Sequence, residues 1–281
     1  MSPRMYPLTL NSRLQLPQGQ IFWHETGQDG QTLIFLHGSW YQHRQWEAIT
    51  KQLGKRYHCL ALDLPGFGDD PFAKSHLSIN FLVECLEQYV ELLQLDRVYL
   101  IGHSIGAWVG AMYALEHPEN VKGLVLMAPE GVETPELTNR QNLGKKLAGK
   151  TPWLYWYYRL IYPLAKFCKK HEKIEKYLQF RKQLIQSPAT YNLLFKRRKS
   201  EIEAEFLNEK LPNLKIPLLV IYGSKDTPIV TSMSQIYSDL SAISDLLVVE
   251  GGSHNLPQEM PDKIANYIEE FILKKKSLWD W

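Results

Sequence analysis

The sequence predicts an α/β protein built on a mostly parallel, doubly wound sheet, with one helical segment inserted into it. Continuous apolar runs of strand length alternate with segments of helical spacing along most of the 281 residues. Strands that are apolar on both faces belong to parallel sheets with helices on each side. Hydrophobic residues make up 44% of the chain and charged residues 22%, which is ordinary for a soluble globular protein.

The elements follow one another in a regular order. Residues 12–16 and 20–25 predict a hairpin around Pro17-Gln18-Gly19. Six buried strands are then predicted at 32–38, 58–64, 98–104, 123–129, 217–223 and 245–251. Helices are predicted at 42–57, 79–95, 105–117, 231–240 and 261–274. In such sheets, functional groups gather in the loops at the carboxyl ends of the strands.

One stretch, residues 131–210, breaks this rhythm. It has no strand-like run, and it holds 17 Lys and Arg against 8 Glu and no Asp, a net charge of 17 − 8 = +9. The whole chain carries only +2, which leaves 2 − 9 = −7 for the remainder. We therefore expect a helical cap at 131–210, inserted between a first core part at 1–130 and a second at 211–281.

The bulk properties exclude several classes of function. A net charge of +2 gives no case for a nucleic-acid partner. Three widely spaced cysteines suit reduced thiols better than a disulfide framework. The first residues lack the apolar stretch of a signal peptide, and no apolar run approaches the ~20 residues of a membrane span, so we expect a cytoplasmic protein. Metal-site and dinucleotide motifs are absent, so no metal and no cofactor are expected.

The clearest motif is Gly102-His103-Ser104-Ile105-Gly106, which matches G-x-S-x-G between a predicted strand and a predicted helix. A sharp strand-to-helix turn exposes the serine hydroxyl as a nucleophile, and glycines on either side avoid a clash. The Ile105 N–H at the helix start is then one donor for an oxyanion. The plainer alternative is a structural turn.

A serine nucleophile needs a base, and of the nine histidines only His254 lies in a loop directly after a late strand. Asp226 follows the preceding strand and is the expected acid partner of His254. Glu130 is the rival acid. His103, inside the turn, supports the site at most. The alternatives are a solvated loop histidine and a turn aspartate.

The loop after the first parallel strand, His37-Gly38-Ser39-Trp40, is expected to supply the second oxyanion donor. The Ser39 N–H is the predicted donor, with the Trp40 N–H as runner-up and a simple strand-ending turn as the alternative. The loop Asp63–Asp69 is interpreted as a wall of the site, with the Asp63 carboxylate hydrogen-bonded to backbone.

Five segments in order, LHGSW, DLPGFGD, GHSIGA, YGSKD and GGSH, make the chain resemble a capped serine hydrolase of the α/β-hydrolase superfamily. That group includes esterases, small lipases, meta-cleavage-product hydrolases and the menaquinone-pathway synthase. The resemblance implies catalysis by Ser104, His254 and Asp226 through an acyl-enzyme without a cofactor. A serine at 104 disfavours haloalkane dehalogenase and epoxide hydrolase activity, since those enzymes place an aspartate there.

The cap carries a dense group of aromatic residues. We expect substrate to be bound by Trp40 and, under an apolar ceiling formed by the cap, by Trp153 and Trp156. The alternative is that the aromatic rings of the cap form its own core. The excess of positive charge in the cap has three possible interpretations. It is a solvated surface, it steers an acidic substrate, or it contacts an anionic membrane, for which the expected basic residues are Lys169, Lys170, Arg197, Arg198 and Lys199.

The expected activity is hydrolysis of a carboxylic ester of an apolar small molecule or lipid. The first alternative is C–C bond hydrolysis or elimination on an anionic substrate by the same three residues. The second alternative is a protein without enzymatic activity that binds a ligand or lies on a membrane. The sequence leaves the oligomeric state open.

Overall fold

The computed structural model describes residues 9–16, 19–67 and 77–279. Its eight-stranded sheet has the order β1-β2-β4-β3-β5-β6-β7-β8. The strands are β1 (Thr9–Leu16), β2 (Gly19–Thr26), β3 (Thr32–Leu36), β4 (His58–Asp63), β5 (Val98–His103), β6 (Val121–Met127), β7 (Leu218–Gly223) and β8 (Ser244–Val249). β2 runs antiparallel to β1 and β4, and all other pairs are parallel. The predicted mostly parallel sheet is confirmed.

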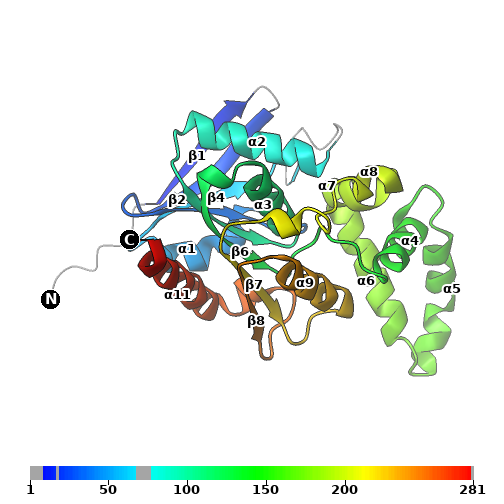
Figure 1. Ribbon diagram of the computed structural model, residues 1–281. Coiled ribbons are helices and arrows are strands. Elements are labelled where there is room, and N and C mark those ends of the chain that lie inside the picture. Colours follow the sequence, from blue (N-terminus) through cyan, green and yellow to red (C-terminus); the bar gives the residue numbers. More distant parts are fainter. Residues whose placement is uncertain (1–8, 17–18, 68–76, 280–281) are drawn as a thin grey trace.

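Helices cover both faces of the sheet (Figure 1). The helices of the core are α1 (Glu47–Leu53), α2 (Ile79–Leu92), α3 (Ile105–Glu116), α9 (Pro228–Leu240), α10 (Leu256–Glu259) and α11 (Pro261–Trp279). One apolar cluster packs α2, α3 and α9 against the sheet. A second cluster packs α1 and α11 against the opposite face. Strands buried on both faces need apolar side chains in both directions, which is why their sequences are continuous apolar runs.

The region predicted as one helix at 42–57 is divided in the structure. A 3₁₀ turn, η1 (His43–Trp46), comes before α1, and the chain leaves the helix at Gly54. The prediction of a single helix was therefore too long. Its apolar side chains are nevertheless buried, with Trp46 and Ile49 in the core beneath the sheet.

The cap consists of helices between β6 and β7 and stands at one end of the sheet (Figure 1). Its elements are α4 (Leu137–Ala148), α5 (Trp153–Phe167), α6 (Glu172–Gln186), α7 (Pro188–Tyr191), the π-helical turn η4 (Asn192–Lys196) and α8 (Lys199–Glu203). Helices α4 and α6 contact each other, and α5 packs against both of them. The division of the chain at residues 130 and 210 into core and cap stays a prediction.

The three cysteines are free thiols, as predicted. Cys59 and Cys85 are buried in the core, whereas Cys168 is exposed directly after α5. Burial raises the pKa of the Cys59 thiol, because the charged thiolate is disfavoured away from water. Cys59 is therefore an apolar core residue rather than a reactive one.

Candidate active site

Ser104 sits on a sharp turn between β5 and α3. Its backbone has φ 53° and ψ −114°, a region that serine rarely adopts. The Ser104 N–H donates to the Met127 carbonyl at 2.9 Å, and the Ser104 carbonyl accepts from the Glu130 N–H at 3.3 Å. These bonds to the loop after β6 hold the strained residue in place. A Cβ at Gly106 would collide with the Leu36 carbonyl, so only glycine lets α3 approach β3 this closely.

His254 and Asp226 meet at the carboxyl ends of β8 and β7. The His254 Nδ1 lies 2.9 Å from the Asp226 Oδ2, and the other carboxylate oxygen accepts from the Thr227 N–H at 2.7 Å. Because an ionised carboxylate only accepts hydrogen bonds, Nδ1 carries the proton and Nε2 is left as an acceptor. The Asp226 side chain is 1% exposed, so its carboxylate is shielded from water, whereas 29% of the His254 side-chain surface is exposed.

One cavity brings these residues together. Its volume is about 680 Å³, and Ser104, Asp226 and His254 all line it. Its apolar wall comes from the cap and α9 and includes Leu143, Phe180, Leu194, Phe195, Ile229 and Val230. Its polar wall includes Glu130, Glu136, Asn139, Arg140 and Gln183. The apolar lining with a few polar groups is typical of a site for a small organic ligand.

The three expected substrate-binding tryptophans lie in different places. Trp40 lines the cavity beside Ser104. Trp153 and Trp156 do not line it, because they lie on the outer face of α5 with 57% and 61% of their surfaces exposed. The expectation that these two rings form a ceiling was wrong. The cap reaches the cavity instead through Leu143, Phe180 and the η4 residues.

The loop after β3 is fixed on both sides of Ser39. The Leu64 N–H donates to His37 Nε2 at 3.0 Å, so the proton of this ring is on Nδ1, which donates to the Gly38 carbonyl at 2.8 Å. Burial lowers the pKa of His37, consistent with a neutral ring. The Tyr41 N–H donates to the same carbonyl at 3.1 Å. Since a trans peptide points its N–H opposite its carbonyl, these bonds fix the direction of the Ser39 N–H.

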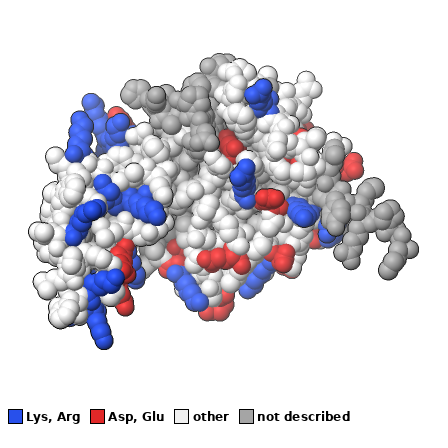
Figure 2. Space-filling view, turned by 180° about the vertical axis from the view of Figure 1, so that it is seen from behind, with Lys and Arg blue, Asp and Glu red and all other residues white. Residues whose placement is uncertain are grey.

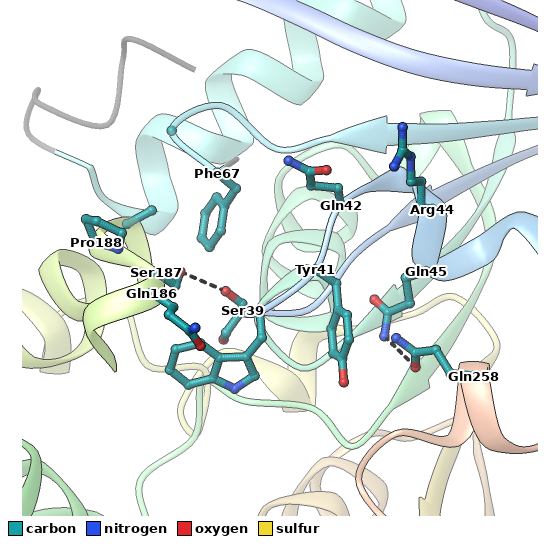
Figure 3. Close-up of a pocket in the computed structure, with 13 residues that line it drawn as sticks. Ser39, Tyr41, Gln42, Arg44, Gln45, Phe67, Gln186, Ser187, Pro188 and Gln258 are labelled. Carbon is teal, nitrogen blue, oxygen red and sulfur yellow. Dashed lines mark hydrogen bonds between the residues drawn. The ribbon is translucent and has the colours of Figure 1, made fainter. Parts of the chain in front are cut away.

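The cap holds the next peptide of this loop. The Ser39 carbonyl accepts from the Thr190 hydroxyl at 2.6 Å and from the Ser187 hydroxyl at 3.0 Å. Figure 3 shows Ser187 beside Ser39, at the edge of a second pocket of about 510 Å³. Within the described residues, neither the Ser39 N–H nor the Ile105 N–H has a protein acceptor. No acceptor in the described part of the chain therefore occupies either predicted oxyanion donor, or the Trp40 N–H, the runner-up.

A buried amide links three of the loops around the cavity. The Gly38 N–H donates to Gln45 Oε1 at 2.9 Å, and Gln45 Nε2 donates to His103 Nδ1 at 2.9 Å. His103 Nε2 then donates to the carbonyl of His254 at 2.9 Å. Burial, and after it the nearby His254, hold the pKa of His103 well below its ordinary value, which keeps the ring neutral. Gln45 was missed by the sequence analysis, and His103 supports the site as expected.

Glu130, the rival acid, has a different partner. Arg140 of α4 binds both of its carboxylate oxygens, at 2.6 and 2.5 Å. Burial alone would raise the pKa of Glu130, but the Arg140 charge and hydrogen bonds outweigh burial and lower it. The pair joins the core to the cap at the cavity wall. The sequence did not indicate Arg140 as a site residue, because its contact with Glu130 joins two parts of the chain that were assigned separately to cap and core.

The described part of the loop after β4 has the expected Asp63 contact, but it lines the second pocket and not the cavity of Ser104. The Asp63 carboxylate accepts from the His43 backbone N–H at 2.5 Å and contacts the His43 ring at 2.9 Å. Gly66 and Phe67 line the second pocket (Figure 3). Gly68 and Asp69, the end of the predicted wall loop, lie outside the described residues.

The comparison with protein families decides the fold family. The model of the alpha/beta hydrolase fold matches residues 31–259 of the chain. The chain belongs to the α/β-hydrolase family. This agrees with the resemblance found in the sequence motifs and with the order of the strands in the sheet.

Two similar curated relatives of the protein are ester-cleaving hydrolases by name. The mouse Monoacylglycerol lipase ABHD6 is 26% identical over 253 residues, which cover 86% of this chain and 75% of the relative. The Pimeloyl-[acyl-carrier protein] methyl ester esterase of Aeromonas hydrophila is 25% identical over 250 residues, covering 86% of this chain and 96% of the relative. These relatives support the expectation of a carboxylic-ester hydrolase.

Solved structures share the fold. A bacterial membrane phospholipase A superposes with a TM-score of 0.74 at 21% identity, covering 95% of this chain and 87% of that one. A thermophilic esterase from Thermogutta terrifontis superposes with a TM-score of 0.70 at 20% identity, covering 95% of this chain and 99% of that one. At this level of identity the likeness concerns the fold alone.

Proposed function

We propose that this α/β hydrolase is a serine hydrolase that cleaves carboxylic esters with an apolar acyl part and a small polar alcohol part. The observation that carries the proposal is the 2.9 Å contact between His254 Nδ1 and Asp226 in a cavity that Ser104 also lines. This contact fixes the tautomer that a general base beside a serine requires.

In the proposed mechanism, His254 Nε2 takes the proton of the Ser104 hydroxyl as the oxygen attacks the ester carbonyl. The Ser39 and Ile105 N–H groups stabilise the oxyanion, with the positive end of the α3 dipole behind Ile105. His254 returns the proton to the leaving alcohol. It then activates water, which releases the acid from the acyl-enzyme.

The substrate class follows from the walls of the cavity. The apolar residues of the cap and α9 suit an acyl chain or another apolar group, while Asn139 and Gln183 offer amides to a polar alcohol. Arg140 does not favour an anionic substrate, since Glu130 already binds its guanidinium through two hydrogen bonds. This disfavours C–C hydrolysis or elimination on an anionic substrate.

The last part of the proposal concerns where in the cell the protein lies. Within the described residues, no helix combines the length and the apolar character required to cross a bilayer. We propose a cytoplasmic protein that binds the surface of an anionic membrane through its cap.

The first test is labelling with a fluorophosphonate probe, followed by turnover of esters of rising acyl length. We expect Ser104→Ala to abolish labelling and to lower turnover by roughly 10⁴-fold or more, because the nucleophile is lost. Ser238→Ala removes a hydroxyl of α9 that lies outside the cavity, 3.3 Å from the Ser244 hydroxyl; it is the matched control and keeps both signals.

Three results would overturn the proposal. Labelling that persists in folded Ser104→Ala would remove Ser104 as the nucleophile. Labelling that depends on Ser104, combined with no turnover of any ester in the series, would favour C–C hydrolysis or elimination. Failure of the wild-type protein to label at all would favour a binding role without catalysis.

A further inference from the structure

Helix α5 packs against α6 through one face, whose side chains are half-buried. The Tyr158 ring stacks on Tyr177 with a centroid distance of 5.1 Å. The Arg181 guanidinium lies 3.7 Å from the centroid of the Tyr155 ring. The Tyr162 hydroxyl donates to Glu175 at 2.6 Å. These contacts attach α5 to α6 and determine which side of the helix points outward.

The outer face of α5 is apolar and uncovered. Its exposed large apolar side chains are Trp153, Trp156, Tyr157, Leu160, Leu164 and Phe167. Apart from the adjacent Trp156 and Tyr157, they recur every three or four residues, so they form one stripe along the helix. In the described part of the chain, the three most exposed large apolar side chains are Phe167, Leu160 and Leu164, at 86%, 80% and 67%. A 15-residue helix makes this stripe roughly 20 Å long.

A continuous apolar stripe differs from scattered surface residues. Single exposed apolar side chains are normal on soluble proteins, but contiguous patches mark surfaces that bind something. The other exposed large apolar side chains of the described chain, such as Leu92 and Ile243, are distributed over several elements. The α5 stripe is therefore a candidate docking surface.

Positive charge surrounds this surface. Residues 137–171 contain no Asp or Glu, and their eight Lys and Arg residues are Arg140, Lys145, Lys146, Lys150, Arg159, Lys166, Lys169 and Lys170. Except for Arg140, all are exposed, and none forms an ion pair with an acidic residue in the described chain. Figure 2 shows Lys and Arg side chains spread over the cap end of the molecule, which lies at the left of that view.

We propose that the outer face of α5 docks on a lipid bilayer that carries anionic lipids, with the apolar stripe in the interfacial layer and the surrounding lysines at the phosphates. Trp and Tyr prefer this layer, and a helix with one apolar face and basic flanks binds in the membrane plane. A second copy of the chain fits less well. A two-fold contact through α5 would bring two positively charged caps together.

This assignment changes which basic residues face the membrane. Arg197 binds the buried Glu205 at 2.6 Å, and Lys199 pairs with Glu203 at 3.1 Å on α8. Lys166, Lys169 and Lys170 lie on or directly after α5 and have no such partners in the described chain. The inference does not rest on the proposed ester hydrolysis, since lipid binding is measured without turnover.

The test is flotation of the full-length protein with phosphatidylcholine vesicles, with and without phosphatidylserine. We expect binding to the anionic vesicles. The double variant Leu160→Glu/Phe167→Glu should lower the partition coefficient at least ten-fold, because two large apolar side chains leave the interface. Leu92→Glu, at a leucine of α2 that is 56% exposed, is the matched control and should bind as the wild type does.

A second variant tests the electrostatic part. Lys166→Gln/Lys169→Gln/Lys170→Gln should weaken binding to phosphatidylserine vesicles and leave the residual binding to neutral vesicles unchanged. Ser104→Ala should bind as the wild type does, so failure of the catalytic proposal and failure of this one are distinguishable. Unchanged labelling of the α5 variants by the fluorophosphonate probe shows that they are folded.

Three outcomes would overturn the inference. The first is that the wild-type protein does not float with either vesicle. The second is that it floats and the α5 variants float equally well. The third is a dimer in analytical ultracentrifugation that dissociates in Leu160→Glu/Phe167→Glu, which would assign the stripe to a second copy of the chain.

Discussion

Gln45 joins three loops that lie far apart in the sequence. Its side chain bonds the Gly38 N–H and His103, and His103 bonds the carbonyl of His254. The same network therefore holds the peptide before Ser39 and the loop of the proposed base. Gln45, Gly38 and His103 are buried, so each bond that they lose would leave a buried polar group without a partner.

We expect Gln45→Met to lower kcat by about ten-fold or more with little change in KM. The methionine keeps the side-chain volume but not the two hydrogen bonds, so the reacting groups are displaced by fractions of an ångström. Steady-state kinetics on the preferred ester measures kcat and KM separately. Gln52→Met, which alters an exposed amide bonded to Asn266, is the control. A fall in stability without a fall in kcat would show that Gln45 is only structural.

The residues of the candidate site differ in how far the sequence can predict them. Ser104, Asp226 and His254 each follow an apolar strand, and parallel strands place their carboxyl ends at one edge, so pattern alone brings them together. The predicted acid is indeed the one that contacts His254. Gln45 belongs to a short 3₁₀ turn, and nothing in its local sequence indicates a partner 58 positions away.

Among the elements, the packing of α3 depends on small residues that let it approach β3 closely. Gly106 and Gly110 lie one turn apart on the same side of this helix. A Cβ at Gly106 would collide with backbone carbonyls of Leu36 and His37. A Cβ at Gly110 would lie 3.4 Å from the Leu36 side chain, which is an ordinary contact.

We therefore expect opposite effects from two alanine substitutions. Gly106→Ala should lower the free energy of unfolding by at least about 2 kcal/mol, because backbone atoms have to move. Gly110→Ala should raise it by up to about 1 kcal/mol, because alanine is the better helix former. Urea denaturation measures both. Equal destabilisation by the two variants would mean that the approach of α3 to β3 does not limit residue size.

The sequence predicts a helix or strand correctly where the apolar residues of the element all pack against the same sheet. The inner strands β3 to β7 are apolar because both faces are covered, and all eight strands were predicted. Helix α5 shows what the sequence pattern cannot predict. Its apolar stripe has a clear period, but a period does not say whether the stripe faces the protein or the outside. That choice depends on Tyr158 and Tyr155 packing on α6, which is a tertiary contact.

At the scale of the whole molecule, one buried carboxylate fastens the end of the cap to the core. Glu205 accepts from the Ile79 N–H at 3.1 Å at the start of α2 and from Arg197 at 2.6 Å. Its side chain is 4% exposed, so it depends on these partners. Arg197 was expected to face a membrane, but its partner shows that it has a structural role.

We expect Arg197→Met to lower the free energy of unfolding by about 3 kcal/mol or more, since an uncompensated charge would stay buried. Its neighbour Arg198 is 87% exposed at the side chain, and Arg198→Met should change the free energy of unfolding by less than about 0.5 kcal/mol. Chemical denaturation at neutral pH compares the two adjacent arginines. Similar small effects would show that Glu205 is stable without Arg197.

The place of the cap in the chain has a consequence for how the molecule can be altered. The cap leaves after β6 and returns before β7, and these strands are direct neighbours in the sheet. Because β6 and β7 are parallel, the end of β6 and the start of β7 lie at opposite edges of the sheet. The two ends of the cap nevertheless meet, since the Leu207 N–H donates to the Gly131 carbonyl at 2.9 Å, so an insertion of almost any length begins and ends at nearly the same point. The sheet and the cap are thus exchangeable parts. A different cap grafted at this junction would give the same Ser104 turn a new cavity wall, and with it a new range of substrates.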